Sequence, residues 1–352
     1  MRLAVFALPL LLAAPPALGS EAATAVDGRA LSLLWGLPFL GVLLSIALMP
    51  LIAGRIWHHH YGKIAAGWAV LFLAPYALAF GPEAAWEEFT HVLVQEYLPF
   101  IALLLALYTT GGGVLLRGTL VGTPAANTAL LAAGTALASV MGTTGASMVL
   151  IRPVLRANAF RRRKTHTFVF FIFLVSNIGG SLTPLGDPPL YLGFLKGVSF
   201  FWPTTHLFAE FLFCTVVLLA LYYVLDHVAW ARERPAPPET TAREGLRIEG
   251  RVNLVLLGVV LAVVLGMGFA PMREVSVLGQ PVGLERLLGM AAFLVITLLS
   301  VRLTPAALRE ANGFAWGAMA EVAKLFAAIF VTMAPVIAIL RAGREGAAAS
   351  LV

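Results

Sequence analysis

Charged residues are scarce in this sequence. Asp, Glu, Lys and Arg make up 12% of its 352 residues, whereas hydrophobic residues make up 60%. Soluble domains carry charge on about 25% of their residues, and a soluble core of this length could not bury so much apolar surface. A soluble globular fold is therefore excluded, and the composition predicts an all-α polytopic membrane protein.

Cysteine is nearly absent, since Cys214 is the only one. An intramolecular disulfide is excluded, and the redox compartment stays undetermined. The net charge of +6 could indicate a nucleic-acid partner. The basic residues, however, fall in short loops between apolar runs, as the positive-inside rule requires. We therefore expect the lipid bilayer as the partner and no nucleic acid.

The N-terminal residues 1–20 have the pattern of a cleavable signal peptide. Arg2 precedes an apolar core, and the small residues Ala17 and Gly19 stand where cleavage would occur. Removal of this segment would leave an extracytoplasmic N-terminus. We expect a multi-pass protein of a bacterial-type inner (plasma) membrane.

Loop charges predict which loops face the cytoplasm. The cluster Arg161–Lys164 is basic and predicts a cytoplasmic loop, as does His58–His60 between the first two apolar runs. Residues 83–96 carry four glutamates and no Lys or Arg, which predicts an outer loop with an amphipathic helix at the interface. Asp226 stands near the end of its span, where water relieves the cost of its charge.

The stretch Ser176–Gly193 cannot form an uninterrupted helix although it lies in an apolar run. Helix-breaking residues and one acid interrupt it, namely Gly179, Gly180, Pro184, Gly186, Asp187, Pro188, Pro189 and Gly193. Irregular backbone at membrane depth must be buried in protein or line a wet cavity. We predict a broken helix over residues 167–201 that forms a transport site, with Ser176, Asn177 and Thr183 as added ligands. A kink used only for helix packing is the alternative.

A second interruption falls in the apolar run at 124–153, where Gly142–Gly145 reads Gly-Thr-Thr-Gly. Both flanks of the run are basic, at Arg117 and Arg152. The arms are short against the roughly 20 residues that a membrane span needs. We therefore favour a re-entrant hairpin, which enters the membrane from the cytoplasm and leaves on the same side. The alternative is two spans joined by a tight outer turn.

The two halves of the chain show weak internal similarity. Glu96 and Glu321 each stand at the start of a long apolar segment that ends in Leu-Arg. The loop charges predict that the two segments cross the membrane in opposite directions. The pattern predicts an inverted-repeat transporter with a first repeat at 31–228, a cytoplasmic linker at 229–251 and a second repeat starting at 252. The offset of 225 residues (321 minus 96) would place a second hairpin beyond residue 352. We therefore expect the second repeat to be incomplete in a C-terminally truncated sequence.

The stretch SNIGGSLTPLGDPP resembles the ion-transporter superfamily, which includes citrate and dicarboxylate carriers, arsenite permeases and sodium/proton antiporters. The resemblance implies a re-entrant hairpin with a polar tip, followed by a broken helix, both repeated inverted. It assigns the hairpin tip to Thr143, Thr144 and Gly145. It assigns the broken helix to Ser176, Asn177, Gly179, Gly180, Gly186, Asp187, Pro188 and Pro189.

Two departures from the carriers of that superfamily bear on the substrate. The hairpin tip reads Thr-Thr-Gly where dicarboxylate carriers have Ser-Asn-Thr, and Asp187 stands where they have a neutral hydroxyl residue. A fixed acid repels an anion but suits a cation or a proton. We therefore expect a sodium/proton antiporter, in which Asp187 and Asn177 hold the transported cation. A citrate or other anion carrier (dicarboxylate, arsenite) is the alternative.

Other function classes fit less well. An aspartyl membrane protease needs a second acid in mid-span, and a serine protease needs a G-x-S-x-G-like turn, and the sequence offers neither. We expect no enzyme activity and no cofactor. A passive channel stays open, because broken helices also line ion filters, and so does a homodimer.

Overall fold

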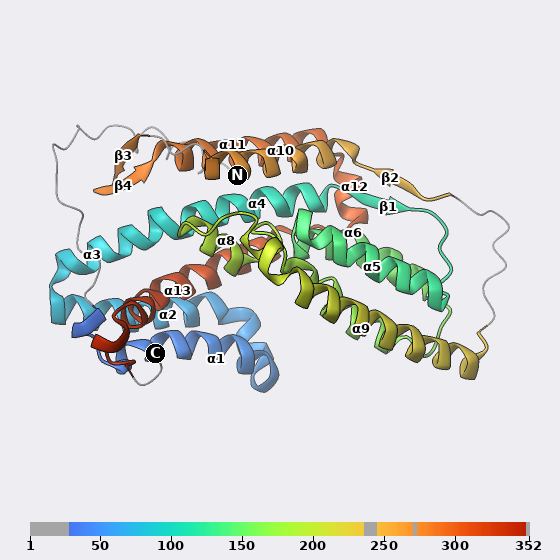
Figure 1. The fold of residues 1–352 in the computed structure, drawn as a ribbon, viewed down its shortest axis with the longest axis horizontal. Helices are drawn as coiled ribbons and strands as arrows, with labels where there is room; N and C mark the ends of the chain where they lie inside the picture. The colour runs from blue at the N-terminus through green and yellow to red at the C-terminus, as the bar shows by residue number, and fades with distance from the viewer. Residues whose placement is uncertain (1–27, 236–244, 270–272, 350–352) are drawn as a thin grey trace. The chain divides into compact units, whose positions relative to one another are not determined.

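The computed structural model describes residues 28–235, 245–269 and 273–349. The predicted signal peptide at residues 1–20 lies outside these residues. Helices make up most of the described chain, whose strands form two short two-stranded sheets (Figure 1). The predicted all-α fold class is confirmed. The chain divides into two compact units, which are described separately.

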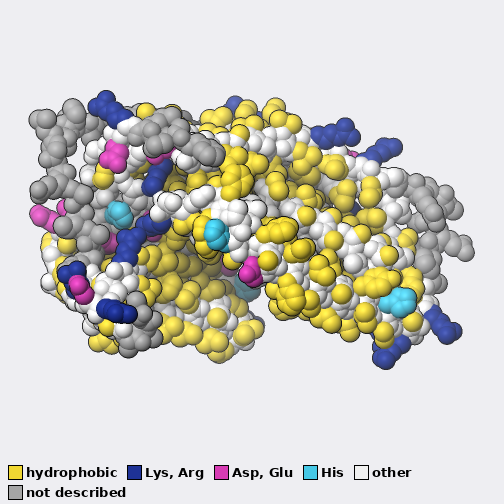
Figure 2. Space-filling view, in the orientation of Figure 1, with side chains coloured by type: hydrophobic (Ala, Val, Ile, Leu, Met, Phe, Trp, Pro, Cys, Tyr) yellow, Lys and Arg dark blue, Asp and Glu magenta, His cyan; other side chains and the backbone are white. Residues whose placement is uncertain are grey.

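Eight helical segments of the described residues are long and apolar enough to cross a membrane. They are Leu33–Ile52, Gly54–Phe80, Pro82–Gly112, Pro124–Met141, Trp202–Glu233, Arg251–Gly268, Leu284–Leu303 and Trp316–Arg341. Large apolar side chains remain exposed on them, for example Leu78 at 90% and Phe213 at 68%. Hydrophobic side chains cover much of the visible surface (Figure 2). Such surface is stable against lipid rather than water, so the protein is a multi-pass membrane protein.

The first unit comprises residues 1–101, 271–287 and 315–352. Its core is formed by three long helices, α1 (Leu37–Ile52), α2 (Gly54–Phe80) and α13 (Trp316–Arg341). Val42, Ala65 and Ala328, one from each helix, are buried together. Two of these three side chains are alanines, which lets the helix backbones approach closely.

Helix α2 begins earlier than predicted. The sequence places His58–His60 in a loop, whereas the structure includes them in α2 with all three side chains exposed. The turn after α1 needs only Ala53, so α2 begins at Gly54. Continuing the helix beyond its apolar part satisfies backbone hydrogen bonds that a loop would leave to water.

Residues 83–96 are helical, as the predicted amphipathic helix requires, but they continue directly into the next apolar helix instead of forming a separate loop. Helix α3 (Pro82–His91) continues through a π-helical turn, η4 (Val92–Tyr97), into α4 (Leu98–Gly112). Glu96 is only 5% exposed. The sequence missed this continuity because four glutamates lower the hydropathy of a segment whose other face is buried.

A β-hairpin that the sequence analysis did not predict packs beside η4. Strands β3 (Glu274–Val277) and β4 (Gln280–Gly283) pair antiparallel around a turn in which Leu278 and Gly279 both have positive φ. That backbone matches the two-residue turn favoured by hairpins. Gln95 of η4 donates to the Pro281 carbonyl, and Arg286 Nη1 donates to Gln95 Oε1 over 2.8 Å.

The second unit comprises residues 102–270 and 288–314. It contains the C-terminal part of α4 and most of α11 (Leu284–Leu303). The helices that lie wholly within it are α5 (Pro124–Met141), α6 (Thr143–Ala157), α7 (Thr165–Leu174), α8 (Pro188–Leu195), α9 (Trp202–Glu233), α10 (Arg251–Phe269) and α12 (Ala306–Ala311). Helix α5 packs against both α6 and α9.

The segment predicted as a linker is anchored at both ends. Helix α9 continues to Glu233, and strand β2 (Arg247–Glu249) pairs antiparallel with β1 (Leu115–Arg117). An exposed ion pair of 3.0 Å joins Arg117 to Glu249 in this sheet. Residues 236–244 of the linker lie outside the described residues.

The order of helices partly repeats along the chain. Two long helices, a short helix and another long helix occur first as α1, α2, α3 and α4, and again as α10, α11, α12 and α13. The β3–β4 hairpin between α10 and α11 has no counterpart between α1 and α2. The order is compatible with two repeats, whose inverted relation stays a prediction.

The topology can be tested with single cysteines in a Cys214→Ala background, since Cys214 is exposed. The loop charges predict that Glu87→Cys reacts with an impermeant thiol reagent on intact cells. Arg163→Cys should react only after permeabilisation, which also serves as its accessibility control. Labelling of Arg163→Cys on intact cells would contradict the orientation.

Candidate functional site

The hairpin α5–α6 turns within a single residue. Thr123 caps α5 by accepting a 3.2 Å hydrogen bond from the Ala126 amide, and Pro124 occupies the first turn, where a missing N–H costs nothing. Gly142 ends α5 with φ of +78°, a conformation that side chains disfavour. Helix α6 begins at the next residue, so Thr143 stands at the hairpin tip.

The second element of the site is a break between α7 and α8. The chain leaves helical geometry after Leu174, forms one 3-10 turn, η5 (Ile178–Gly180), and becomes helical again at Pro188. Local bonds replace the helical ones, such as Gly186 N to Thr183 O at 3.0 Å. Asp187 stands at the N-cap of α8 in an extended conformation, and its carboxylate makes no capping hydrogen bond.

The hairpin tip and the break are in direct contact. The Thr143 amide donates to the Gly186 carbonyl over 3.1 Å, and Ser139 Oγ donates to the Gly179 carbonyl over 2.5 Å. A Cβ on Gly186 would lie 2.1 Å from the Gly180 carbonyl oxygen. Glycine is therefore required for two stretches of backbone to pass this closely.

The predicted site residues fall into two groups. Some lie at this crossing or hydrogen-bond to the hairpin, namely Thr143, Ser176, Gly179, Gly180, Thr183 and Gly186. Asp187 is half-buried directly after Gly186. Thr144 and Asn177 are exposed, and no hydrogen bond of their side chains to the crossing is among the described contacts. The placement supports Asp187 as a ligand more strongly than Asn177.

Sequence reasoning missed two serines of the hairpin arms. Ser139 bonds the Gly179 carbonyl and accepts at its own carbonyl from the Thr183 hydroxyl, while Ser147 Oγ lies 2.8 Å from Ser176 Oγ. The two serines lie four residues before and four after Thr143. Within α6 that spacing places Ser147 on the same face as Thr143, which was a signal available from the sequence. Ser139 belongs to α5, and its contact with the break follows from the turn at Gly142.

The crossing contains the kinds of groups that bind small ions in proteins. Backbone carbonyls and hydroxyls gather there beside one carboxylate, which are the ligands of a hard cation. The N-terminus of α6 also lies at the hairpin tip, and the first N–H groups of a helix attract an anion. No group of three or more His, Cys, Asp and Glu suited to a resident metal occurs within the described residues.

Packing at Gly186 can be tested by Gly186→Ala. The added methyl would meet the Gly180 carbonyl, and we expect a loss of about 1–3 kcal/mol in unfolding free energy, the usual cost of overpacking. Thermal unfolding of the purified protein measures this loss. Gly67→Ala in α2 is the matched control, because no atom lies within 4 Å of its added Cβ. Equal melting temperatures for the two variants would contradict the close approach.

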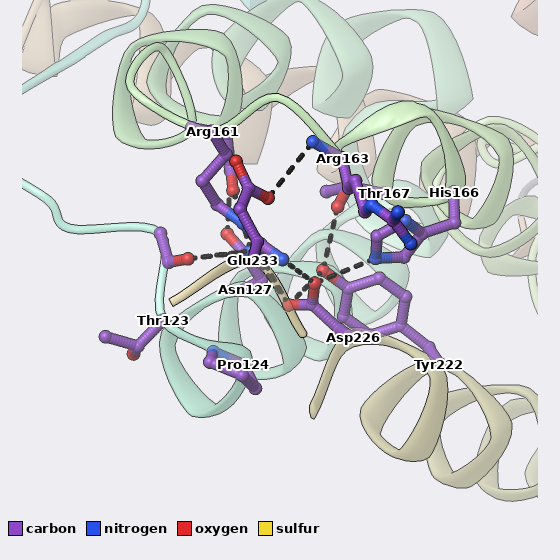
Figure 3. A network of polar contacts seen from close by, with 12 residues as sticks. Thr123, Pro124, Asn127, Arg161, Arg163, His166, Thr167, Tyr222, Asp226 and Glu233 are labelled. Carbon is purple, nitrogen blue, oxygen red and sulfur yellow. Dashed lines mark hydrogen bonds and ion pairs between the residues drawn. The ribbon is translucent and has the colours of Figure 1, made fainter. Parts of the chain in front are cut away.

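A buried polar network joins the base of the hairpin to α7 and α9 (Figure 3). Arg161 and Asp226 form an ion pair whose side chains are both 0% exposed. Asp226 also accepts hydrogen bonds from Asn127 (3.2 Å), His166 (2.8 Å) and Tyr222 (3.1 Å). Asp226 therefore compensates the buried Arg161 charge and accepts from three further side chains.

The network corrects two sequence-based interpretations. Arg161 was assigned to a solvated cytoplasmic cluster, and Asp226 to the wet end of a span, yet neither side chain contacts solvent. Each charge is buried because the other compensates it. Asn127 and Asn158 exchange two hydrogen bonds of 2.9 and 2.8 Å, so both arms of the hairpin are held at this end.

Asp226→Asn should destabilise the protein by roughly 3–5 kcal/mol, because it leaves the Arg161 charge buried without a partner. The measurement is thermal unfolding in detergent. Glu210→Gln is the control on the same helix, where the side chain is exposed. A melting temperature of Asp226→Asn equal to that of Glu210→Gln would show that the ion pair contributes nothing.

Comparison with known proteins gives one match. A family model described as "Putative citrate transport" matches residues 28–352. No match was found among curated proteins or among solved structures. The match covers nearly the whole chain and includes the hairpin, the break and every candidate site residue. The chain therefore belongs to this family of citrate-transporter-like membrane proteins.

Proposed function

We propose that this protein is a secondary transporter that binds a cation at Asp187, where the hairpin meets the broken helix. The observation that carries the proposal is the environment of the Asp187 side chain. Asp187 is half-buried at a helix break, makes no capping hydrogen bond and directly follows Gly186 at the crossing. An acid within the membrane is costly, and is most often retained for ion binding.

Sodium/proton antiport is the function we place first. At Asp187 a proton and Na⁺ compete for the same carboxylate, so protonation releases the cation and deprotonation lets the next cation bind. Ser176, Thr183 and backbone carbonyls of the break would complete an oxygen shell. The contact of Thr143 with Gly186 supports this role for the hairpin tip, because a shift of the hairpin would alter the shell.

Carboxylate transport is the second candidate, and the family description favours it. The first N–H groups of α6 could bind a carboxylate, but the charge of Asp187 would repel it. A cation or proton bound at Asp187 removes that repulsion. Anion and cation would then bind together, which is the requirement for coupled uptake.

Asp187→Asn keeps the shape of the side chain and removes its titratable charge. We expect it to reduce sodium-driven proton movement in proteoliposomes at least tenfold. The same variant tests the second candidate through citrate uptake driven by a Na⁺ or proton gradient, which should become independent of the gradient. Glu83→Gln makes the same chemical change at an exposed position of α3 and should leave both activities unchanged.

Two results would contradict the proposal. Full sodium/proton exchange by Asp187→Asn would reject antiport through this residue. If Asp187→Asn took up citrate with the same dependence on the gradient as the unmodified protein, coupling at Asp187 would be rejected as well. Flux that runs only down the gradient of the ion itself would instead indicate a channel.

A further inference from the structure

Arg309 is a buried cation outside the crossing described above. It belongs to α12, between α11 and α13, and is 8% exposed. Its Nη1 donates to the Thr109 carbonyl over 2.8 Å, and its Nη2 donates to the carbonyl and hydroxyl of Ser300 over 2.7 and 2.8 Å. The guanidinium also lies 4.9 Å from the centre of the Phe314 ring. Its Nε–H is buried without a partner.

All of these partners of Arg309 are neutral. Within residues 28–235, 245–269 and 273–349, the ion pairs found join Arg29, Arg117 and Arg161 to acids, and His166 to the same acid as Arg161. Arg309 is not among them. A buried arginine is ordinarily compensated by a carboxylate, as Arg161 is by Asp226. Arg309 therefore has no carboxylate partner among the described residues, and only the partial negative charge at the C-terminal ends of α4 and α11 offsets its positive charge.

Capping of α4 does not account for this charge. Arg309 bonds the Thr109 carbonyl in the last turn of α4, where carbonyls lack helical partners. Asn312 does the same for the next carbonyls, donating to Gly112 O at 3.2 Å and Val114 O at 2.9 Å. A neutral amide is sufficient for that role, so the charge of Arg309 needs another explanation.

The end of α4 that Arg309 holds lies against the hairpin. A Cβ on Gly111 would be 2.7 Å from Gly145 Cα, in the first turn of α6 after the tip. A Cβ on Gly112 would meet the side chain of Phe314 and that of Met148, which belongs to α6. The charge is thus connected to the hairpin tip through one turn of α4.

We propose that Arg309 determines substrate charge, and that its positive charge makes the crossing favour a small carboxylate anion once a cation occupies Asp187. This inference rests on the second candidate of the proposed function, carboxylate transport with a cation bound at Asp187 in the crossing. The Arg152 guanidinium lies beside Gly313 and adds to the same field, while Glu310 is exposed. A unit charge about 10 Å away changes the binding of a monovalent ion roughly tenfold at an effective dielectric constant near 20.

Ser300 allows the charge to be cancelled without altering Arg309. Ser300→Asp would place a carboxylate beside Nη2 of Arg309, whereas Ser300→Asn would place a neutral group of nearly the same shape there. These two variants differ in charge and also in donor capacity, because the Asn amide can donate to the Thr109 carbonyl and Asn253 Oδ1 as the Ser300 hydroxyl does, whereas the Asp carboxylate cannot. Thermal unfolding of both variants therefore accompanies the comparison. We expect citrate to bind the purified Ser300→Asp variant about tenfold more weakly than Ser300→Asn, measured by calorimetry in saturating Na⁺ at pH 7. A smaller ratio in the same direction is expected for succinate, because it carries less negative charge than citrate at pH 7.

Arg309 itself provides a second pair if the Ser300 variants do not fold. Arg309→Lys keeps the charge and should bind citrate about tenfold more tightly than Arg309→Met, and thermal unfolding shows whether each is folded. Equal citrate affinity within either folded pair would overturn the proposal, as would tighter binding to Ser300→Asp. Wild-type protein that binds Na⁺ but neither citrate nor succinate would overturn it too.

The binding assay separates this proposal from the function on which it rests. Equilibrium binding requires no transport. Full coupled flux by Asp187→Asn, which would reject the proposed function, therefore leaves the comparison of the Ser300 pair valid. Conversely, coupling at Asp187 with equal citrate affinity for the Ser300 pair rejects only the role of Arg309.

Discussion

Backbone groups that leave helical geometry inside a membrane must find partners within the protein, and this constraint governs the structure around the break. Between Leu174 and Pro188 the chain forms short local turns and then bonds to the hairpin, most directly from Thr143 N to Gly186 O. Glycines at 180 and 186 make that contact possible because any side chain would hold the backbones apart. The break and the hairpin therefore stabilise each other.

The two ends of the hairpin are held by different forces. At its base, Asp226 and Arg161 form a buried ion pair in which the acid accepts from three further side chains. At its tip, the recorded contacts with the break are single hydrogen bonds and close glycine packing. Separating the buried ion pair would leave a charge without its partner, whereas each hydrogen bond between the hairpin and the break joins neutral groups. The tip is thus the end better suited to change during transport.

The buried charges of the second unit differ in how they are compensated. The pair of Arg161 and Asp226 is neutral overall and serves the structure. Asp187 and Arg309 have no ion-pair partner among the described residues and carry opposite signs. Asp187 directly follows Gly186, which bonds to the hairpin tip, and Arg309 bonds the end of α4, which lies against α6. Together they could bind a cation and an anion, which is the combination that coupled carboxylate transport needs.

The sequence by itself determined the membrane class, most span positions, the hairpin turn and the break, because hydropathy, glycine and proline act locally. The tertiary structure decided which residues meet. It buried Arg161 and Arg309, placed Ser139 and Ser147 at the crossing, and left Asn177 exposed. Burial and pairing depend on contacts between residues far apart in the chain, such as Arg161 with Asp226 or Arg309 with Thr109. No local pattern in the sequence specifies those contacts.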